Sequence, residues 1–223
     1  YAAENRARAM KVRQQILSES DDGKRVLVTD LLNLKRNDSE QARQQGFHCI
    51  VHLDDSGISE YQADLFIAGI VLKDEKRVTI DRARILSGPE YQIINPETVS
   101  YRPPHPWTKN KVENILISFG GADPGRQTEA ILEHLSEKHE DLCWTIVVGP
   151  AFGSKRTTYL KQFTSSSITV VESPQSMCKL VLDHDLVVTL GGLTSYEAMC
   201  LGRPVGAITW SYMGFYVEKL AEL

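Results

Sequence analysis

The stretch that most constrains the fold runs from Asp185 to Trp210 and has the pattern strand, turn, helix, strand. Residues 186–190 form a short apolar run that ends at the pair Gly191-Gly192, which is typical of a strand buried on both faces. Residues 193–201 have a helix-compatible composition, and a second apolar run follows at 205–208. The stretch therefore predicts a βαβ unit with a glycine turn between its first strand and its helix.

Such a turn has a chemical use, because glycines let a ligand approach the backbone and the amino end of the next helix favours a phosphate. Thr194 and Ser195 would add hydroxyl donors, and Glu197, one helical turn later, would accept hydrogen bonds from ribose hydroxyls. This order of residues fits a ligand that carries a diphosphate and a ribose. The alternative is that Gly191-Gly192 is a tight turn only, with Ser195 as a helix cap and Glu197 on an exposed face.

Composition is that of an ordinary globular protein, with 223 residues of which 42% are hydrophobic and 24% charged. The net charge is −4 and the basic residues are scattered, which argues against a nucleic-acid partner. No apolar run approaches the ~20 residues that span a bilayer, and no charged-then-apolar leader is visible. We therefore expect no integral membrane segment and a cytoplasmic location; the oligomeric state is open.

The four cysteines are far apart and carry no metal-ligand spacing: Cys49, Cys143, Cys178 and Cys200. We expect reduced thiols, most of them in the core, and neither a metal site nor a cofactor.

Strands and helices alternate along the chain, which predicts an α/β fold with parallel sheets. The expected strands of the first half are 24–30, 47–53, 64–69 and 91–96, and the expected helices are 4–18 and 38–46. A proline-rich segment at 101–111 is the expected linker, with a long surface loop as its alternative. The predicted domains are thus residues 1–100, incomplete at the start, and 112–223.

A second glycine turn, Gly120-Gly121, follows the strand expected at 113–119, and Gly149 lies near the end of the strand expected at 144–150. Ligands of open parallel sheets bind outside the carboxyl ends of the strands. We therefore expect the loops at Gly120-Gly121, Gly149, 172–173 and Gly191-Gly192 to share one rim that carries the site.

The segments 115–124 and 190–205 together resemble the nucleotide-sugar hydrolases of pseudaminic acid synthesis and the spore coat polysaccharide biosynthesis proteins of the SpsG type. Both groups are similar to the UDP-N-acetylglucosamine transferase of lipid II synthesis. The resemblance implies a GT-B fold, in which two Rossmann-like domains face each other across a cleft. It also implies a UDP-sugar as the ligand and hydrolysis that releases UDP without a metal.

By position, the resemblance assigns the diphosphate to Gly191, Gly192, Thr194 and Ser195, and the ribose to Glu197. It assigns the phosphate side of the cleft to Gly120 and Gly121 and the neighbouring rim to Gly149. The chain departs from the family in two places. The family's glycine-histidine turn is absent before the first expected strand, and 211–216 stands where the family has an Asn-Gln pair.

The catalytic residue is therefore unassigned, and Asp30, Asp54 and Asp55 are candidates because they follow expected strands. Two classes of function stay open. One is an enzyme, either a UDP-sugar hydrolase of polysaccharide biosynthesis or a UDP-sugar glycosyltransferase, and the other is a non-catalytic nucleotide-sugar-binding relative. Because the chain begins and stops inside element patterns, we expect a fragment.

Overall fold

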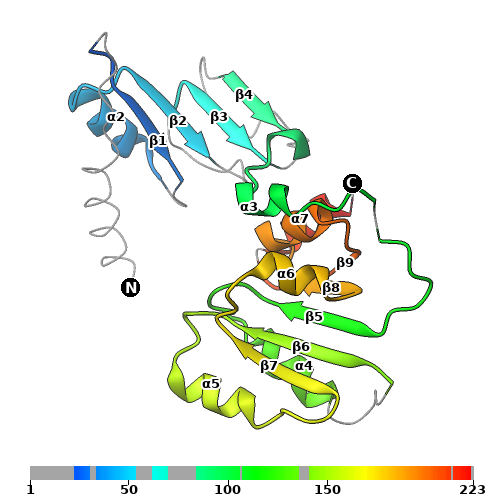
Figure 1. Ribbon diagram of the computed structural model, residues 1–223. Coiled ribbons are helices and arrows are strands. Elements are labelled where there is room, and N and C mark those ends of the chain that lie inside the picture. The colour runs from blue at the N-terminus through cyan, green and yellow to red at the C-terminus, as the bar shows by residue number, and fades with distance from the viewer. Residues whose placement is uncertain are drawn as a thin grey trace. The chain divides into compact units, whose positions relative to one another are not determined.

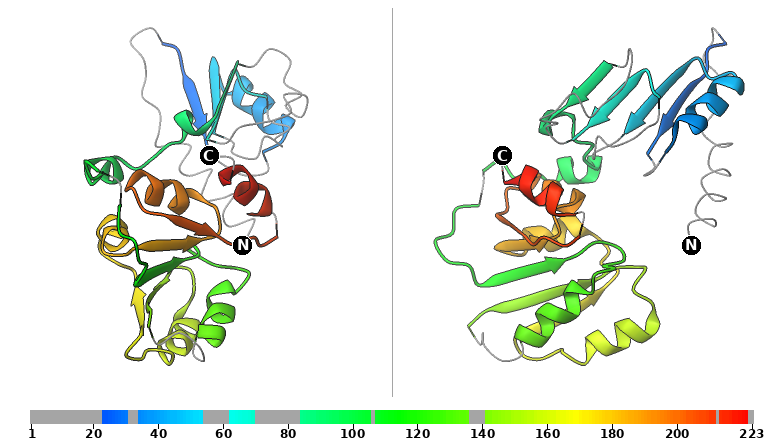
Figure 2. Two further views of the ribbon diagram at one scale, coloured as in Figure 1. Left: turned by 90° about the vertical axis from the view of Figure 1, so that its right-hand side faces the viewer. Right: turned by 180° about the vertical axis from the view of Figure 1, so that it is seen from behind.

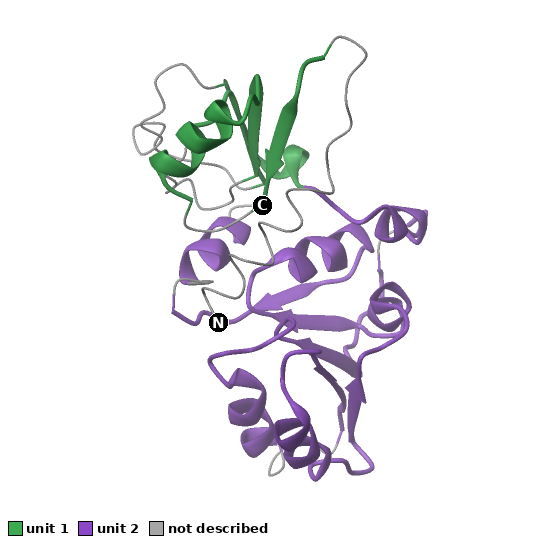
Figure 3. Cartoon of the chain, turned by 90° about the vertical axis from the view of Figure 1, so that its left-hand side faces the viewer, with its two compact units in different colours: residues 1–92 green, residues 93–223 purple. Residues whose placement is uncertain are grey.

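The computed structural model describes residues 23–30, 34–53, 62–69, 84–105, 107–135, 141–211 and 213–221. The expected helix 4–18 and the candidates Asp54 and Asp55 lie outside these residues. The chain divides into two compact units, residues 1–92 and 93–223 (Figure 3). Each unit holds one parallel sheet with helices interleaved between its strands, so the predicted α/β fold of two Rossmann-like domains is confirmed (Figure 1).

The sheet of the first unit has four strands in sequence order, all parallel. They are β1 (Val26–Thr29), β2 (Cys49–Leu53), β3 (Leu65–Ala68) and β4 (Arg84–Ser87). Helix α2 (Arg36–Gln44) packs Ala42 into a small core with Phe47, Ile50 and Phe66. The strands expected at 24–30, 47–53 and 64–69 correspond to β1, β2 and β3.

The strand expected at 91–96 is wrong. The chain instead forms a 3₁₀ turn, η2 (Pro89–Tyr91), and then helix α3 (Pro96–Ser100). Asn95 caps α3 by accepting a hydrogen bond from the Glu97 N–H, and Pro96 suits the first helical position because it lacks an N–H. Ile93 is 55% exposed, so its apolar character reflects no buried strand. Whether a linker occupies 101–111 stays a prediction.

The sheet of the second unit has five parallel strands in the order β7-β6-β5-β8-β9. Their bounds are β5 (Asn114–Ser118), β6 (Cys143–Val148), β7 (Ile168–Glu172), β8 (Leu186–Thr189) and β9 (Val205–Ala207). The central strand β5 pairs with β6 on one side and with β8 on the other. The chain crosses from β7 at one edge to β8 beyond β5, so the strand order reverses next to β5, where open sheets bind ligands.

Helices cover both faces of this sheet. On one face, Leu132 of α4 (Gln127–Leu135) and Leu160 of α5 (Ser154–Lys161) pack against Ile117. On the other face, α6 (Met177–Leu182) and α7 (Leu193–Cys200) pack against Leu116. Alternate residues of β5 thus point to opposite faces, as a strand's period of two requires. Figure 1 shows α6 and α7 in front, and the rear view of Figure 2 shows α4 and α5.

The last helix, α8 (Met213–Leu220), lies beside Gly191, because Val217 of this helix is the nearest neighbour of that glycine. All four cysteines are free thiols, but only Cys178 is buried, so the expectation that most of them lie in the core is wrong: Cys49 and Cys200 are half-buried and Cys143 is exposed. No helix within the described ranges is both long and apolar enough to cross a bilayer.

Candidate functional site

The two glycine turns open into one cavity of about 330 Å³ at the carboxyl ends of β5 and β8. We call residues 120–123 the first turn and residues 190–192 the second turn. The cavity is lined by 118–124 on one side and by Thr189, Leu190 and 192–194 on the other, and Trp210 also lines it. Because all five strands are parallel, the loops after β5, β6, β7 and β8 lie at the same edge of the sheet.

The second turn requires glycine at its centre. Gly191 has φ of +81°, a left-handed conformation that side chains disfavour. A Cβ atom at Gly191 would also lie 2.7 Å from Cγ2 of Val217 in α8, which is closer than real contacts allow. The turn therefore leads into α7 with Gly192 as the N-cap residue, and no side chain of the described residues caps the helix end by a hydrogen bond.

The first backbone N–H groups of α7 lie at this helix end. Within the described part of the chain, no acceptor meets the N–H groups of Gly192, Leu193 or Thr194. Such groups carry the positive end of the helix dipole and favour an anion. Among the described residues that line the cavity there is no lysine or arginine, so an anion held here would depend on backbone N–H groups and on hydroxyl groups such as that of Thr194.

Ser195 lies inside the turn rather than on its surface. It is fully buried, and its Oγ is 2.6 Å from Oγ1 of Thr189. Oγ1 of Thr189 also accepts a hydrogen bond from the Gly191 N–H at 3.2 Å. The Ser195 hydroxyl thus supports the second turn from within, while Thr194, its neighbour in the sequence, lines the cavity.

The Asp123 carboxylate belongs to the protein interior, although the residue lines the cavity. It accepts hydrogen bonds from the backbone N–H groups of Gln127 and Thr128 at 3.0 and 2.9 Å, and from the Thr128 hydroxyl at 2.7 Å. Asp123 thus caps helix α4 by accepting hydrogen bonds from its first N–H groups. Because its oxygens are occupied, this carboxylate does not project its charge freely into the cavity.

Gly149 supports the first turn instead of lining the cavity. It is buried, and a Cβ atom there would lie 2.5 Å from the carbonyl oxygens of both Gly120 and Gly121. The next segment continues this contact, because the Ala151 N–H donates to the Gly121 carbonyl at 2.9 Å. The backbone of the first turn thus rests directly on the loop after β6.

Glu197 lies one turn into α7, on the face that packs against α3. Its side chain is half-buried, and burial together with the nearby carboxylate of Glu97 raises the pKa of Glu197. No hydrogen-bond donor reaches the Glu197 carboxylate from the part of the chain that the structure describes. A ligand hydroxyl would give this carboxylate the partners that it lacks.

The structure adds one cavity residue that the sequence pattern did not indicate. Trp210 follows β9, and its indole covers Gly125, where a Cβ atom would lie 2.3 Å from ring atom Cε2. In the sequence, this contact joins a large aromatic residue to a glycine 85 positions earlier. Hydrophobic periodicity gives no sign of such a pair. Asp30 follows β1 in the first unit and is exposed.

Metal ligands do not gather in the described ranges, where no three His, Cys, Asp or Glu side chains form a metal-binding group. The histidines that are buried in the described part of the chain, His52 and His184, bond to protein partners instead. His52 lies 2.8 Å from the Thr29 hydroxyl, and His184 lies 2.7 Å from the Thr145 hydroxyl.

No family model matches the chain. An uncharacterized protein of Methanocaldococcus jannaschii, MJ1062, is 31% identical over 189 residues, which cover 81% of this chain and 39% of that protein. The spore coat polysaccharide biosynthesis protein SpsG of Bacillus subtilis is 27% identical over 152 residues, or 67% of this chain and 44% of SpsG. The chain spans about two fifths of the length of these relatives. It is therefore distantly related to a spore coat polysaccharide biosynthesis protein.

Proposed function

We propose that the second unit binds a UDP-sugar with its diphosphate in the cavity between the two glycine turns. The observation that carries this proposal is the meeting of both turns and the open amino end of α7 in one cavity of about 330 Å³. Glycines at 120, 121 and 192 let phosphate oxygens approach the backbone, and the free N–H groups of α7 donate to them. Thr194 adds a hydroxyl donor.

The nucleoside end of the ligand extends along α7 toward Glu197. A ribose presents two neighbouring hydroxyl groups, and a carboxylate can accept a hydrogen bond from each. Glu197 suits this role because its carboxylate is half-buried and has no donor among the described residues. Gly149 and Ser195 hold the two turns in place without touching the ligand.

We propose that the whole protein hydrolyses a UDP-linked amino sugar in the synthesis of a surface or spore coat polysaccharide. Water attacks the anomeric carbon or the adjacent phosphorus, the bond to the leaving group breaks, and free sugar and UDP result. The relationship to SpsG supports the pathway, and the glycine turns support the nucleotide. Asp30, Asp54 and Asp55 stay candidates for orienting the water.

A glycosyltransferase or a non-catalytic binding protein is the alternative, and a sugar-release assay with UDP-N-acetylglucosamine separates these from hydrolysis.

Replacing Glu197 by glutamine should weaken UDP binding by tenfold or more. The substitution removes charge-assisted hydrogen bonds worth ~1.5–3 kcal/mol each, and 1.4 kcal/mol is a factor of ten in affinity. Isothermal titration calorimetry of UDP against both proteins measures the change, with CMP and GDP testing base preference. Glu113→Gln is the matched control, because Glu113 is an exposed glutamate at the start of β5, away from the cavity. Unchanged affinity in the Glu197 variant would remove Glu197 from the site.

The affinity for UDP should also fall as the pH decreases. This fall should begin at a higher pH than the titration of an ordinary glutamate would produce. Burial and the Glu97 carboxylate of α3 raise the pKa of Glu197 above the usual value of about 4.3. As the pH falls through that raised pKa, the carboxylate gains a proton and loses part of its acceptor capacity. Titrations of native and Glu197→Gln proteins across pH 4 to 8 test this, because titration of the UDP phosphate is common to both. Equal pH dependence of the two proteins would refute the assignment.

A further inference from the structure

Arg156 of α5 makes five hydrogen bonds, which equals the number of N–H donors on a guanidinium group. Nη1 donates to the backbone carbonyls of Ala122 and Asp123 at 2.9 and 3.0 Å. Nη2 donates to Oδ2 of Asp123 at 2.8 Å and to Oε2 of Glu129 at 2.6 Å, and Nε donates to Oε1 of Glu129 at 2.7 Å. Every donor is therefore used, and three of the five bonds hold the first turn.

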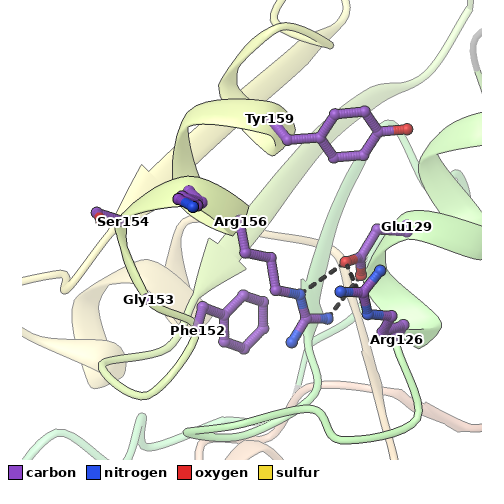
Figure 4. A pocket seen from close by; sticks show the side chains of 8 residues that line it. Arg126, Glu129, Phe152, Gly153, Ser154, Arg156 and Tyr159 are labelled. Carbon is purple, nitrogen blue, oxygen red and sulfur yellow. Dashed lines mark hydrogen bonds and ion pairs between the residues drawn. The ribbon is translucent and has the colours of Figure 1, made fainter.

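The guanidinium is enclosed as well as bonded. The Arg156 side chain is 13% exposed, and the carbon at its centre lies 3.9 Å from the centroid of the Phe152 ring, in a cation–π contact. Figure 4 shows Arg156 between Phe152 and the Glu129 carboxylate. It lines a second cavity, of about 590 Å³, and is absent from the lining of the cavity between the glycine turns. Arg156 thus reaches the first turn from behind.

The first turn needs such support because its backbone is unusual. Asp123 has a positive φ of +40°, although it is not a glycine. Conformations of this kind persist where the surrounding structure determines them. Asp123 is fixed at three points, since its carboxylate caps α4 and meets Arg156 while its carbonyl accepts from Arg156.

We propose that Arg156 is a positioning residue for diphosphate binding, which rests on the function proposed above. It never touches the ligand. Through the carbonyls of Ala122 and Asp123 it sets the conformation of the first turn, and so directs the backbone of Gly120 and Gly121 toward the phosphates. Glu129 in turn orients Arg156, because its two carboxylate oxygens accept hydrogen bonds from Nε and Nη2 of Arg156.

Lysine cannot replace arginine in this role. An ammonium group has three donors on a flexible stem, and it cannot reach two carbonyls and two carboxylates at once as the planar guanidinium does. Arg156→Lys keeps the positive charge between Asp123 and Glu129 but releases part of the turn. The variant therefore separates geometry from charge.

The test compares UDP with uridine, which lacks phosphates, in binding titrations of the native protein and of Arg156→Lys. We expect the variant to bind UDP at least tenfold more weakly while its affinity for uridine stays within twofold. Arg126→Gln is the matched control, because Arg126 is 74% exposed and approaches Glu129 only at 4.0 Å. It should leave both affinities unchanged. Glu129→Gln loosens Arg156 from the side away from the ligand and should also lower the affinity for UDP but not that for uridine. This variant replaces Arg156→Lys in the test if Arg156→Lys does not fold.

The outcomes are distinct. A selective loss of UDP affinity supports the positioning role, whereas an equal loss of UDP and uridine indicates a general structural defect and overturns it. If Arg156→Lys binds UDP with native affinity, the positioning role is overturned and the proposed function stays intact. The same holds for Glu129→Gln where that variant replaces Arg156→Lys in the test. If the native protein binds uridine but gains nothing from the diphosphate, the proposed function and the positioning role both fail.

Discussion

Replacing Gly149 by alanine is expected both to destabilise the protein and to weaken UDP binding by tenfold or more. The added Cβ atom would lie 2.5 Å from the carbonyl oxygens of Gly120 and Gly121 and 2.7 Å from the Gly121 carbonyl carbon. All three are backbone atoms, so no side chain can rotate away and the first turn itself must move. Overpacking of this kind costs about 1–3 kcal/mol. Urea unfolding measures the stability, and calorimetry measures the UDP affinity.

The control for this prediction is the same substitution elsewhere in the same sheet. At Gly206 of β9, an added Cβ atom would meet only Cγ2 of Val188 at 3.7 Å, an ordinary contact. Gly206→Ala should therefore leave UDP affinity near its native value. If Gly149→Ala binds UDP as tightly as the native protein does, the first turn does not contribute to the phosphate site.

The sequence pattern predicts the second unit well because its elements depend on local features. Apolar runs that end at glycines mark β5 and β8, and the run of helix formers between Gly192 and Gly202 marks α7. The error at 91–96 arose because Tyr91, Ile93 and Ile94 resemble a strand when read for hydrophobicity alone. The helix signal Asn95-Pro96 is the stronger feature, since the Asn95 side chain accepts from the Glu97 N–H and Pro96 suits the first helical position.

Only the backbone turns of the candidate site could be predicted from the sequence. Glycine turns after parallel strands must share an edge, so the meeting of 120–121 and 191–192 follows from topology. The orientation of single side chains does not follow. Ser195 looks like Thr194 in the sequence, but its position on the inner side of α7 directs its hydroxyl to Thr189. Arg156 lies 33 residues from Asp123, and only the packed structure brings them together.

Asp185 directly precedes β8, at the end of the strands opposite the glycine turns. Its side chain should be among the most important for stability. Its Oδ2 accepts hydrogen bonds from the backbone N–H groups of Glu113 and Asn114 at 3.0 and 2.9 Å, and its Oδ1 pairs with Lys109 at 2.8 Å. The carboxylate is 2% exposed, whereas the Lys109 side chain is 58% exposed. Removing the carboxylate leaves two N–H groups without their acceptor, at a cost of ~1–3 kcal/mol each.

We therefore expect Asp185→Ala to lower the free energy of unfolding by about 2–4 kcal/mol, and Lys109→Ala to lower it by less than about 1 kcal/mol, because an exposed lysine solvates easily. Urea unfolding at pH 7 measures both. Asp183→Ala is the matched control, since Asp183 is an exposed aspartate two positions earlier. Equal effects of the Asp185 and Asp183 substitutions would show that the buried hydrogen bonds contribute little.

The pH dependence gives the same prediction a second test. The Lys109 ammonium and the two backbone N–H groups hold the pKa of Asp185 far below its usual value of about 3.9, despite the opposing effect of burial. A depressed pKa in the folded state means that Asp185 stabilises the protein fully above about pH 5 and less as the pH falls toward the folded value. The stability difference between native and Asp185→Asn proteins should therefore be constant from pH 5 to 7 and shrink steadily between pH 4 and 2. A difference that stays constant down to pH 2 would mean that the Asp185 carboxylate titrates alike in the folded and unfolded chains.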